Sequence, residues 1–212
     1  MRLHDYWRSS AGYRVRIALG LKGISAARVP VSLLAGDQRS AAYRAVNPEG
    51  LLPALDTGEG VLGQSLAIIE YLEETVPEPA LLPASPLDRA HARRLALMVA
   101  CDIHPVNNLR ILQRLGGQFG ADQAAKDTWY RHWIAEGLGA LEAVLAGDPR
   151  TGTFCLGERP GLADLCLVPQ LYNARRFACP LDGLPTLVRI DAACRALPAF
   201  AAAAPEAQSD AS

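Results

Sequence analysis

The chain of 212 residues lacks an excess of charge of either sign, because 21 basic residues stand against 22 acidic ones. Nucleic-acid-binding domains usually carry a basic patch or stripe, so this mixed and balanced pattern argues against a nucleic-acid partner. An apolar run of roughly 18 residues, the length of a membrane span, is also missing. The N-terminus has no hydrophobic segment followed by a cleavage site. We therefore expect neither a membrane protein nor a secreted one.

Cysteines with the spacing of a redox motif or a metal site are lacking as well. The chain has five cysteines, an odd number, and none of them forms a CxxC motif. Three of them lie in apolar helical runs, where free cysteine behaves as a small buried hydrophobe. These features predict a reduced, cytoplasmic protein without a metal site.

Hydrophobic residues make up half of the chain, enough for a sizeable core, and their pattern changes along it. Up to about residue 76, short apolar runs and helical patterns follow the order strand–helix–strand–helix–strand–strand–helix. A segment with four prolines in twelve residues follows, PEPALLPASPLD, and beyond it nearly every periodic segment is helical. We predict an α/β domain with a small mixed sheet over residues 1–80. An all-helical domain should cover residues 87–212 and end in a frayed tail.

The first turn from strand to helix, RSSAGY, carries an arginine and two serines. Serine before a helix is usually an N-cap, and Ser10 is one candidate for that position, which would leave Ser9 to face a ligand. A helix N-terminus and a hydroxyl donor both favour a thiolate. Because the turn contains no cysteine, thiol chemistry at this position would require an imported thiol.

The segment CDIHPVNNLRIL places Pro105 inside a helical pattern, among a dense cluster of polar residues. A proline in a helix interior costs about 3 kcal/mol and should kink the helix. His104 and Asn108 are four residues apart and would share one face of a continuous helix. Two interpretations stay open: a polar site, or a structural role in which Asn107 and Asn108 satisfy carbonyls that the kink frees.

The order of elements and the stretches RSSAGYRVRIALGLKG, NPEGLLPALDTG and QSLAIIEYLEE resemble the glutathione transferase superfamily. Within it the chain is most similar to the zeta class, the maleylacetoacetate and maleylpyruvate isomerases. The resemblance covers essentially the whole chain, including CDIHPVNNLRIL, LADLCLVPQ and NARRF. It implies a thioredoxin-like N-terminal domain, an all-α C-terminal domain, glutathione as the cofactor and a homodimer.

The resemblance implies that the first turn and one proline loop bind the cysteinyl part of glutathione. Ser9 would hydrogen-bond the sulfur, with Ser10 and Ala11 beside it. The zeta pattern has a cysteine where this chain has Ala11, which leaves a side-chain role at that position open. The peptide bond before Pro53 would be cis, and the backbone of Leu52 would pair with glutathione as a strand does. The alternative is an ordinary trans proline at an edge strand.

Other glutathione contacts are implied at three further places. The γ-glutamyl carboxylate would lie at a helix N-terminus, at Gln64 and Ser65, where unpaired N–H groups favour an anion; Ser65 could also be only a cap. Gln38 matches a glutathione contact more weakly, since a polar loop glutamine is usually solvated. Asp102 and His104 would reach the glutathione of the partner subunit. Asn108 would face the same site from the helical domain.

The resemblance to the substrate site of bacterial maleylpyruvate isomerase falls on three arginines, Arg8, Arg110 and Arg176. Each of them alone would more often be a solvated surface residue. A guanidinium group binds a carboxylate through two parallel hydrogen bonds (bidentate binding) and stays charged, which suits a small dicarboxylate keto acid as substrate. Arg175 should point away from its neighbour. Asp164 matches a capping-box aspartate, which we assign to folding, with Gly161 at the cap position.

The implied activity is cis–trans isomerisation of a maleyl keto acid, either maleylacetoacetate or maleylpyruvate, to its fumaryl isomer. Glutathione thiolate would add to the double bond, the resulting single bond would rotate, and expulsion of the thiolate would regenerate glutathione. Arginine charge would stabilise the enolate. A general glutathione S-transferase for small electrophiles or halo-acids is the alternative, and it would not need three arginines. A non-catalytic binding module is a further alternative, disfavoured because the Ser9 and Gln64–Ser65 motifs are both present.

Overall fold

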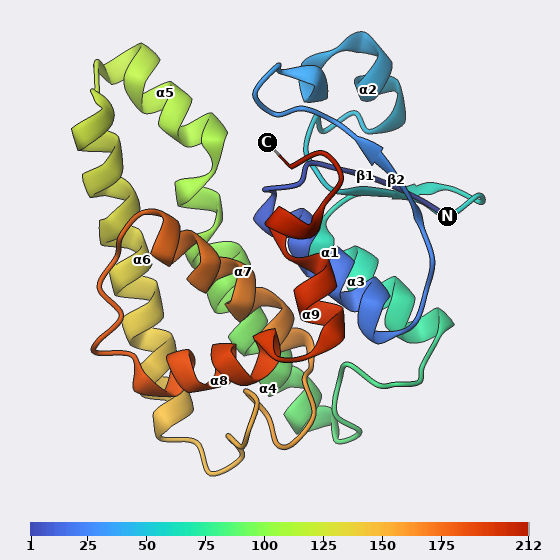
Figure 1. Cartoon of the computed structure of the whole chain (residues 1–212), viewed down its shortest axis with the longest axis vertical. Coiled ribbons are helices and arrows are strands. Elements are labelled where there is room, and N and C mark those ends of the chain that lie inside the picture. Colours follow the sequence, from blue (N-terminus) through green and yellow to red (C-terminus); the bar gives the residue numbers. More distant parts are fainter. Residues whose placement is uncertain (212) are drawn as a thin grey trace. The chain divides into compact units, whose positions relative to one another are not determined.

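The computed structural model describes residues 1–211 (Figure 1). Its contacts cluster into two compact units. The N-terminal unit consists of residues 1–81 together with the C-terminal segment from Arg195, and the helical unit consists of residues 82–194. Among residues 1–211, every helix is too short or too polar to span a lipid bilayer.

The N-terminal unit follows the predicted order of strands and helices. Its elements are β1 (Arg2–Asp5), α1 (Ser10–Leu21), β2 (Ala27–Pro30), α2 (Ala41–Val46), β3 (Ala54–Asp56), β4 (Val61–Leu62) and α3 (Ser65–Thr75). The strands form one sheet in the order β2-β1-β3-β4, in which β1 is parallel to β2 and antiparallel to β3. A short 3₁₀ turn, Asp37–Arg39, precedes α2. The predicted small mixed sheet is therefore confirmed.

The core of this unit lies between the sheet and two helices that pack on each other, α1 and α3. Its fully buried side chains come from β1, α1, β3 and α3, and they include Leu3, Ile17, Leu55, Ile68 and Leu72. Burying a side chain of this size contributes about 1.5–3 kcal/mol each, which is what holds two short helices on a four-stranded sheet. The sheet edge at β4 is reached through a tight turn at Thr57 and Gly60, where the run Asp56-Thr57-Gly58 is typical of a hairpin.

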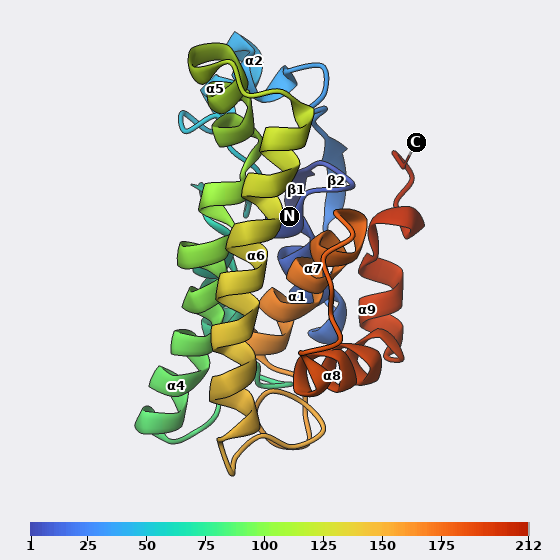
Figure 2. The same cartoon turned by 90° about the vertical axis from the view of Figure 1, so that its left-hand side faces the viewer.

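The helical unit contains α-helices with two irregular turns after the first. The elements are α4 (Pro86–Leu97), a π-helical turn (Met98–Ile103), a 3₁₀ turn (Pro105–Asn107), α5 (Leu109–Phe119), α6 (Gln123–Ala146), α7 (Leu162–Arg176) and α8 (Pro185–Arg195). Figure 2 shows α6 as the long helix beside the segment that continues α4. One apolar stripe along α6 is buried and consists of Ile134, Leu138, Leu141 and Leu145.

Two buried carboxylates hold helix N-termini in this unit. Asp164, 1% exposed, accepts hydrogen bonds from the backbone N–H of Gly161 (2.8 Å) and of Cys155 (2.9 Å). Its bond to Gly161 belongs to a capping box at the start of α7, so the folding role predicted for Asp164 is confirmed. Glu142 of α6 accepts in the same way from the N–H groups of Thr186 (3.0 Å) and Leu187 (2.9 Å) in α8.

The prediction of a frayed tail is wrong for residues up to 211. The last elements are α9 (Pro198–Ala203) and a 3₁₀ turn (Pro205–Ala207), and α9 packs on α1. Phe200 is fully buried, and Gly20 on α1 lets the backbone of Ala199 approach, since a Cβ there would lie 3.2 Å from the Ala199 Cβ. Buried Phe200, together with the hydrogen bonds that Ala203 and Asp210 accept from Arg16 and Trp7, holds the segment in place.

Candidate active site

The first turn of α1 presents the hydroxyl of Ser9. Ser9 is the N-cap of this helix, and its Oγ accepts a hydrogen bond from the N–H of Gly12 at 3.1 Å. Ser10 is the first helical residue and is buried, so the suggestion that Ser10 is the cap is wrong. A hydroxyl can accept one bond and donate another. The cap therefore leaves the O–H of Ser9 as a donor at a helix N-terminus, where the helix dipole favours an anion.

A buried ion pair between α1 and β1 lies next to this turn and contacts its backbone. Arg16 on α1 and Asp5 at the end of β1 are 7% and 0% exposed, and they form a close salt bridge. Arg16 also donates to the carbonyl of Trp7 at 2.9 Å and to that of Ala203 at 3.0 Å. Gly12 allows this arrangement, since any Cβ at that position would overlap the Asp5 carboxylate.

A second buried arginine of α1 lies at the N-terminus of α3. Arg14 is 2% exposed, and its Nη1 donates to the Oγ of Ser65 at 3.3 Å. Its Nε and Nη2 have no hydrogen-bond partner, and no carboxylate within residues 1–211 forms an ion pair with it. Because arginine can only donate, Ser65 must accept this bond and keeps its own O–H as a donor. A helix N-terminus and an uncompensated buried cation together make a strong site for a carboxylate.

The backbone of Gln64, which caps α3, adopts φ 60° and ψ 110°. A positive φ is uncommon for a residue other than glycine and costs roughly 1–3 kcal/mol, a kind of strain that concentrates at ligand sites. Its side chain donates to Glu49 at 2.7 Å, which holds the residue in place. Because Gln64 is the N-cap and Ser65 the first helical residue, the alternative that Ser65 is only a cap is wrong.

The loop before β3 offers an open stretch of backbone. The Leu52–Pro53 peptide bond is cis, as predicted. The carbonyl of the preceding Leu51 accepts from the Tyr43 hydroxyl (2.6 Å) and from the Asn47 amide (3.0 Å). Burial raises the pKa of Tyr43 to about 12, so that its hydroxyl stays a donor. In contrast, the hydrogen bonds formed within residues 1–211 include none from the backbone of Leu52, which suits the predicted strand-like pairing with a peptide.

Gln38 is buried rather than solvated, contrary to the usual behaviour of a loop glutamine. It lies in the 3₁₀ turn, is 8% exposed, and its Oε1 has no partner among the described residues. Its carbonyl lies against Gly50, two residues before Leu52, because a Cβ on Gly50 would be 3.0 Å from it. An orphaned buried amide oxygen is the kind of group that a ligand N–H satisfies.

The segment around Pro105 in the helical unit is broken rather than kinked. Asn108 has an extended backbone, with φ −63° and ψ 147°, and its side chain caps α5 by accepting from the N–H of Arg110 at 3.1 Å. The prediction that His104 and Asn108 share a helix face is therefore wrong, because Pro105 ends the preceding helix. Asn107 donates to the carbonyl of Tyr130 on α6 at 3.3 Å. Asn107 thus donates to a carbonyl of α6 and Asn108 accepts a bond as a cap, which differs from the predicted role of satisfying carbonyls that the kink frees.

The remaining predicted residues are on the same unit. Asp102 and Arg110 are exposed, and His104 is half-buried. Arg176, at the end of α7, is exposed with its guanidinium 4.8 Å from the centre of the Phe177 ring. Its neighbour Arg175 pairs with Asp191 at 2.6 Å.

The predicted residues therefore fall into two groups. The N-terminal unit holds the contacts predicted for glutathione along α1, the 3₁₀ turn, the cis-proline loop and the start of α3: Ser9, Ser10, Ala11, Gln38, Leu52, Pro53, Gln64 and Ser65. The same unit holds Arg8, which is predicted to bind the substrate; it is half-buried, and its guanidinium lies 4.9 Å from the centre of the Trp7 ring. The helical unit holds Asp102, His104, Asn108, Arg110 and Arg176. Sequence reasoning missed Arg14.

Family comparisons match both parts of the chain. Residues 3–80 match the glutathione S-transferase N-terminal domain, and residues 123–206 match the glutathione S-transferase C-terminal domain. The chain belongs to the glutathione S-transferase family. This confirms the resemblance that the sequence shows, together with the thioredoxin-like and all-helical folds predicted from it.

Individual relatives in this family are similar over the full length. A maleylpyruvate isomerase of a Ralstonia species is 50% identical over 210 residues, covering 99% of each chain. The holo structure of a maleylpyruvate isomerase, described as a bacterial zeta-class glutathione transferase, has a TM-score of 0.98 at 50% identity and covers both chains completely. A maleylacetoacetate isomerase from Methylobacterium extorquens AM1, solved with bound malonate and glutathione, has a TM-score of 0.97 at 41% identity over 100% of both chains.

Proposed function

We propose that the chain is a glutathione-dependent isomerase that converts a maleyl keto acid, maleylacetoacetate or maleylpyruvate, to its fumaryl isomer. The observation that carries the proposal is the thiol-free N-terminus of α1, which presents the Ser9 hydroxyl to an imported sulfur. The full-length similarity to isomerases of this name supports it. A cytoplasmic location and a domain boundary between residues 80 and 87 belong to the same proposal.

The described residues of the N-terminal unit fit glutathione as the cofactor. The Ser9 hydroxyl would meet the sulfur, and the open backbone of Leu52 would meet the cysteinyl amide. The uncompensated guanidinium of Arg14 and the Ser65 hydroxyl would meet the γ-glutamyl carboxylate. The orphaned oxygen of Gln38 would accept from a peptide N–H. Among the described residues, Arg14 and Gln38 each have buried polar atoms without a partner, and glutathione could satisfy them.

Glutathione, when bound, supplies the thiolate that adds reversibly to the maleyl double bond and so permits rotation about it. The protein's own residues prepare and complete that chemistry. Ser9 donates to the sulfur and favours its ionised form. Arg8, Arg110 and Arg176 bind the carboxylates of the substrate and stabilise negative charge on its conjugated ketone oxygen.

Replacing Ser9 with alanine is expected to raise the pKa of the bound glutathione thiol. The substitution removes a donor to the sulfur but leaves the contacts at Leu52 and Ser65 intact, so the Kd of glutathione should change little. The measurement is a titration of the thiolate absorbance of the complex, with Ser10→Ala as the matched control. If Ser10→Ala raises the thiol pKa and Ser9→Ala does not, the donor is Ser10.

We also propose that the protein is a homodimer in which Asp102 and His104 complete the partner's glutathione site. Asp102 is exposed, as is Leu97 (43%), which lies just N-terminal to it. An exposed leucine five residues before an exposed carboxylate suits an interface that has an apolar part and a polar ligand contact.

Light scattering should therefore give twice the mass of one chain. Leu97→Glu, which places a charge in the proposed interface, should shift the protein toward monomer and weaken glutathione binding in the same samples. Leu87→Glu changes a leucine that is more exposed (74%) on the same helix and is the control. A monomeric wild type with full glutathione affinity would refute the shared site.

A further inference from the structure

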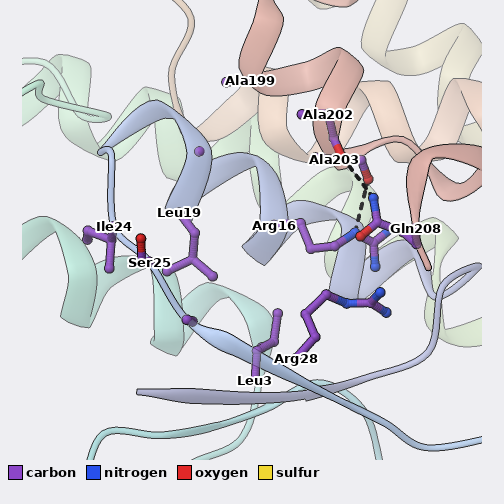
Figure 3. A pocket seen from close by; sticks show the side chains of 12 residues that line it. Leu3, Arg16, Leu19, Ile24, Ser25, Arg28, Ala199, Ala202, Ala203 and Gln208 are labelled. Carbon is purple, nitrogen blue, oxygen red and sulfur yellow. Dashed lines mark hydrogen bonds between the residues drawn. The ribbon is translucent and has the colours of Figure 1, made fainter. Parts of the chain in front are cut away.

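Residues 198–211 form a C-terminal strap, whose helix α9 packs on α1. Arg16 on α1 donates to the carbonyl of Ala203 at 3.0 Å, and Gln208 donates to the carbonyls of Ala202 (2.9 Å) and Ala204 (2.8 Å), which fixes the bend after α9. Figure 3 shows Arg16, Ala203 and Gln208 together, at one side of a cavity of about 290 Å³ between α1, β2 and α9. The strap continues past Gln208 toward the first turn of α1.

Asp210 connects the strap to that turn. One carboxylate oxygen of Asp210 accepts from the backbone N–H of Trp7 at 3.2 Å, and the other accepts from Nη1 of Arg28 on β2 at 2.7 Å. Burial works against the ionised form, but these two donors outweigh it and the pKa of Asp210 lies below its usual value. At neutral pH the group is therefore a carboxylate that accepts both bonds.

Asp210 binds the backbone of Trp7, which lies two residues before Ser9, the proposed donor to the sulfur. The N–H of Trp7 is held by Asp210, and its carbonyl by Arg16, so the peptide groups on both sides of this residue are fixed. The Ser9 N–H then donates to the Tyr6 carbonyl at 2.9 Å, which closes the turn. The backbone that orients the Ser9 hydroxyl is thus anchored by a residue 203 positions away from Trp7.

We propose that Asp210 is a positioning residue of the isomerase: by holding the Trp7 N–H, it keeps the Ser9 hydroxyl directed at the glutathione sulfur. This proposal rests on the proposed function. Arg8 is the residue between Trp7 and Ser9. The same hydrogen bond therefore also positions the backbone of Arg8, one of the three arginines that should bind the substrate. The C-terminal strap is accordingly a part of the catalytic unit.

Charge and geometry predict opposite effects when Asp210 is changed. If Asp210 acted only by its negative charge, removing that charge would stabilise a nearby thiolate, and the pKa of the bound thiol would fall in Asp210→Ala and Asp210→Asn alike. If Asp210 acts by holding the backbone, Asp210→Ala weakens the Ser9 bond and the thiol pKa rises. Asparagine keeps an acceptor for the Trp7 N–H, so Asp210→Asn should leave the thiol pKa close to that of the wild type.

The experiment compares these two variants with Asp56→Ala as the matched control. Asp56 also accepts from one arginine, Arg2, and from one backbone N–H, that of Gly58, in the same unit, but it does not contact the turn. For Asp210→Ala we expect the bound thiol pKa to rise by about 0.5–1 and kcat/KM for maleylpyruvate near neutral pH to fall about three- to tenfold. The fall should lie in kcat, with the Kd of glutathione nearly unchanged.

Three results would decide against the proposal. A lower Tm for Asp210→Ala with an unchanged thiol pKa would make the strap merely structural. A fall of the thiol pKa in both Asp210 variants would mean that Asp210 acts through its negative charge and not by holding the Trp7 backbone. An equal rise in Asp56→Ala would mean that any loosening of the unit has this effect. A wild type that neither binds glutathione nor lowers its thiol pKa would instead refute the proposed function.

Discussion

Replacing Arg16 with methionine is expected to lower the free energy of unfolding by about 3–5 kcal/mol, the usual cost of removing one partner of a buried ion pair. Asp5 is 0% exposed and would keep a buried negative charge whose remaining cation, Arg28, is 3.6 Å away. The carbonyls of Trp7 and Ala203 would each lose a donor as well. Urea unfolding followed by circular dichroism measures this change.

Arg14 provides the matched control, two residues earlier on the same helix. It is buried like Arg16, but it pairs with no carboxylate within residues 1–211 and makes one hydrogen bond, to Ser65. Because its burial is uncompensated, Arg14→Met should change the free energy of unfolding of the ligand-free protein by less than about 1 kcal/mol. It should weaken glutathione binding about tenfold, corresponding to about 1.4 kcal/mol.

A ligand without the γ-glutamyl carboxylate separates the two explanations for weaker binding. Arg14→Met should bind γ-aminobutyryl-cysteinyl-glycine as well as the wild type does, since that peptide lacks the carboxylate but keeps the thiol. Equal losses for this peptide and for glutathione would show that Arg14 supports the fold around Ser65 rather than the carboxylate. Similar instability of the two arginine variants would contradict the distinction between a paired and an unpaired buried cation.

The order of helices and strands was predictable because apolar periodicity and turn residues, which are local sequence patterns, indicate it. The apolar period of three to four residues marks α3 and α6, and the run Asp56-Thr57-Gly58 marks the hairpin between β3 and β4. The Asp164 cap was also recognisable, because a capping box needs only residues three apart. Interactions that span a few residues leave a signature in the sequence.

At Pro105 the local sequence pattern indicates that the helix is disturbed, but not what form the disturbance takes. The sequence indicates a disturbance of the helix there, and the structure has one, but as a complete break followed by a new helix. The signal for the restart was present: asparagine is a preferred N-cap, and Asn108 precedes the apolar periodic run Leu109–Leu112. The prediction of one kinked helix therefore put His104 and Asn108 on a common helix face, which the structure does not have.

Long-range contacts explain what sequence reasoning missed. The bond between Trp7 and Asp210 joins the two ends of the chain, and the pairing of Arg16 with Asp5 depends on how α1 lies on β1. Arg14 and Arg16 alternate with apolar residues and look alike in the sequence, yet one is paired and the other is not. Only the packing of α1 against the sheet, α3 and α9 distinguishes them.

Replacing Arg176 with alanine is expected to lower kcat/KM for maleylpyruvate by roughly ten- to a hundredfold, since a charge-assisted hydrogen bond contributes about 1.5–3 kcal/mol. The Kd of glutathione should change little, because the glutathione contacts that we propose at Leu52, Gln64 and Ser65 lie in the N-terminal unit. Arg176 belongs to the helical unit, at the exposed end of α7. A neutral electrophile conjugated by the same thiolate should be affected less than a dicarboxylate.

Arg175→Ala is the control for this effect, because it removes the same side chain from the neighbouring position. Arg175 is held by Asp191, and successive residues on a helix point apart, so its loss should reduce stability without selecting between substrates. The informative quantity is therefore the ratio of kcat/KM for maleylpyruvate to that for the neutral electrophile, measured in the wild type and in both variants. A ratio that falls only in Arg176→Ala assigns the guanidinium to the substrate carboxylate. A ratio unchanged in both variants would make Arg176 structural, through its contact with the Phe177 ring, and would favour a general transferase over an isomerase.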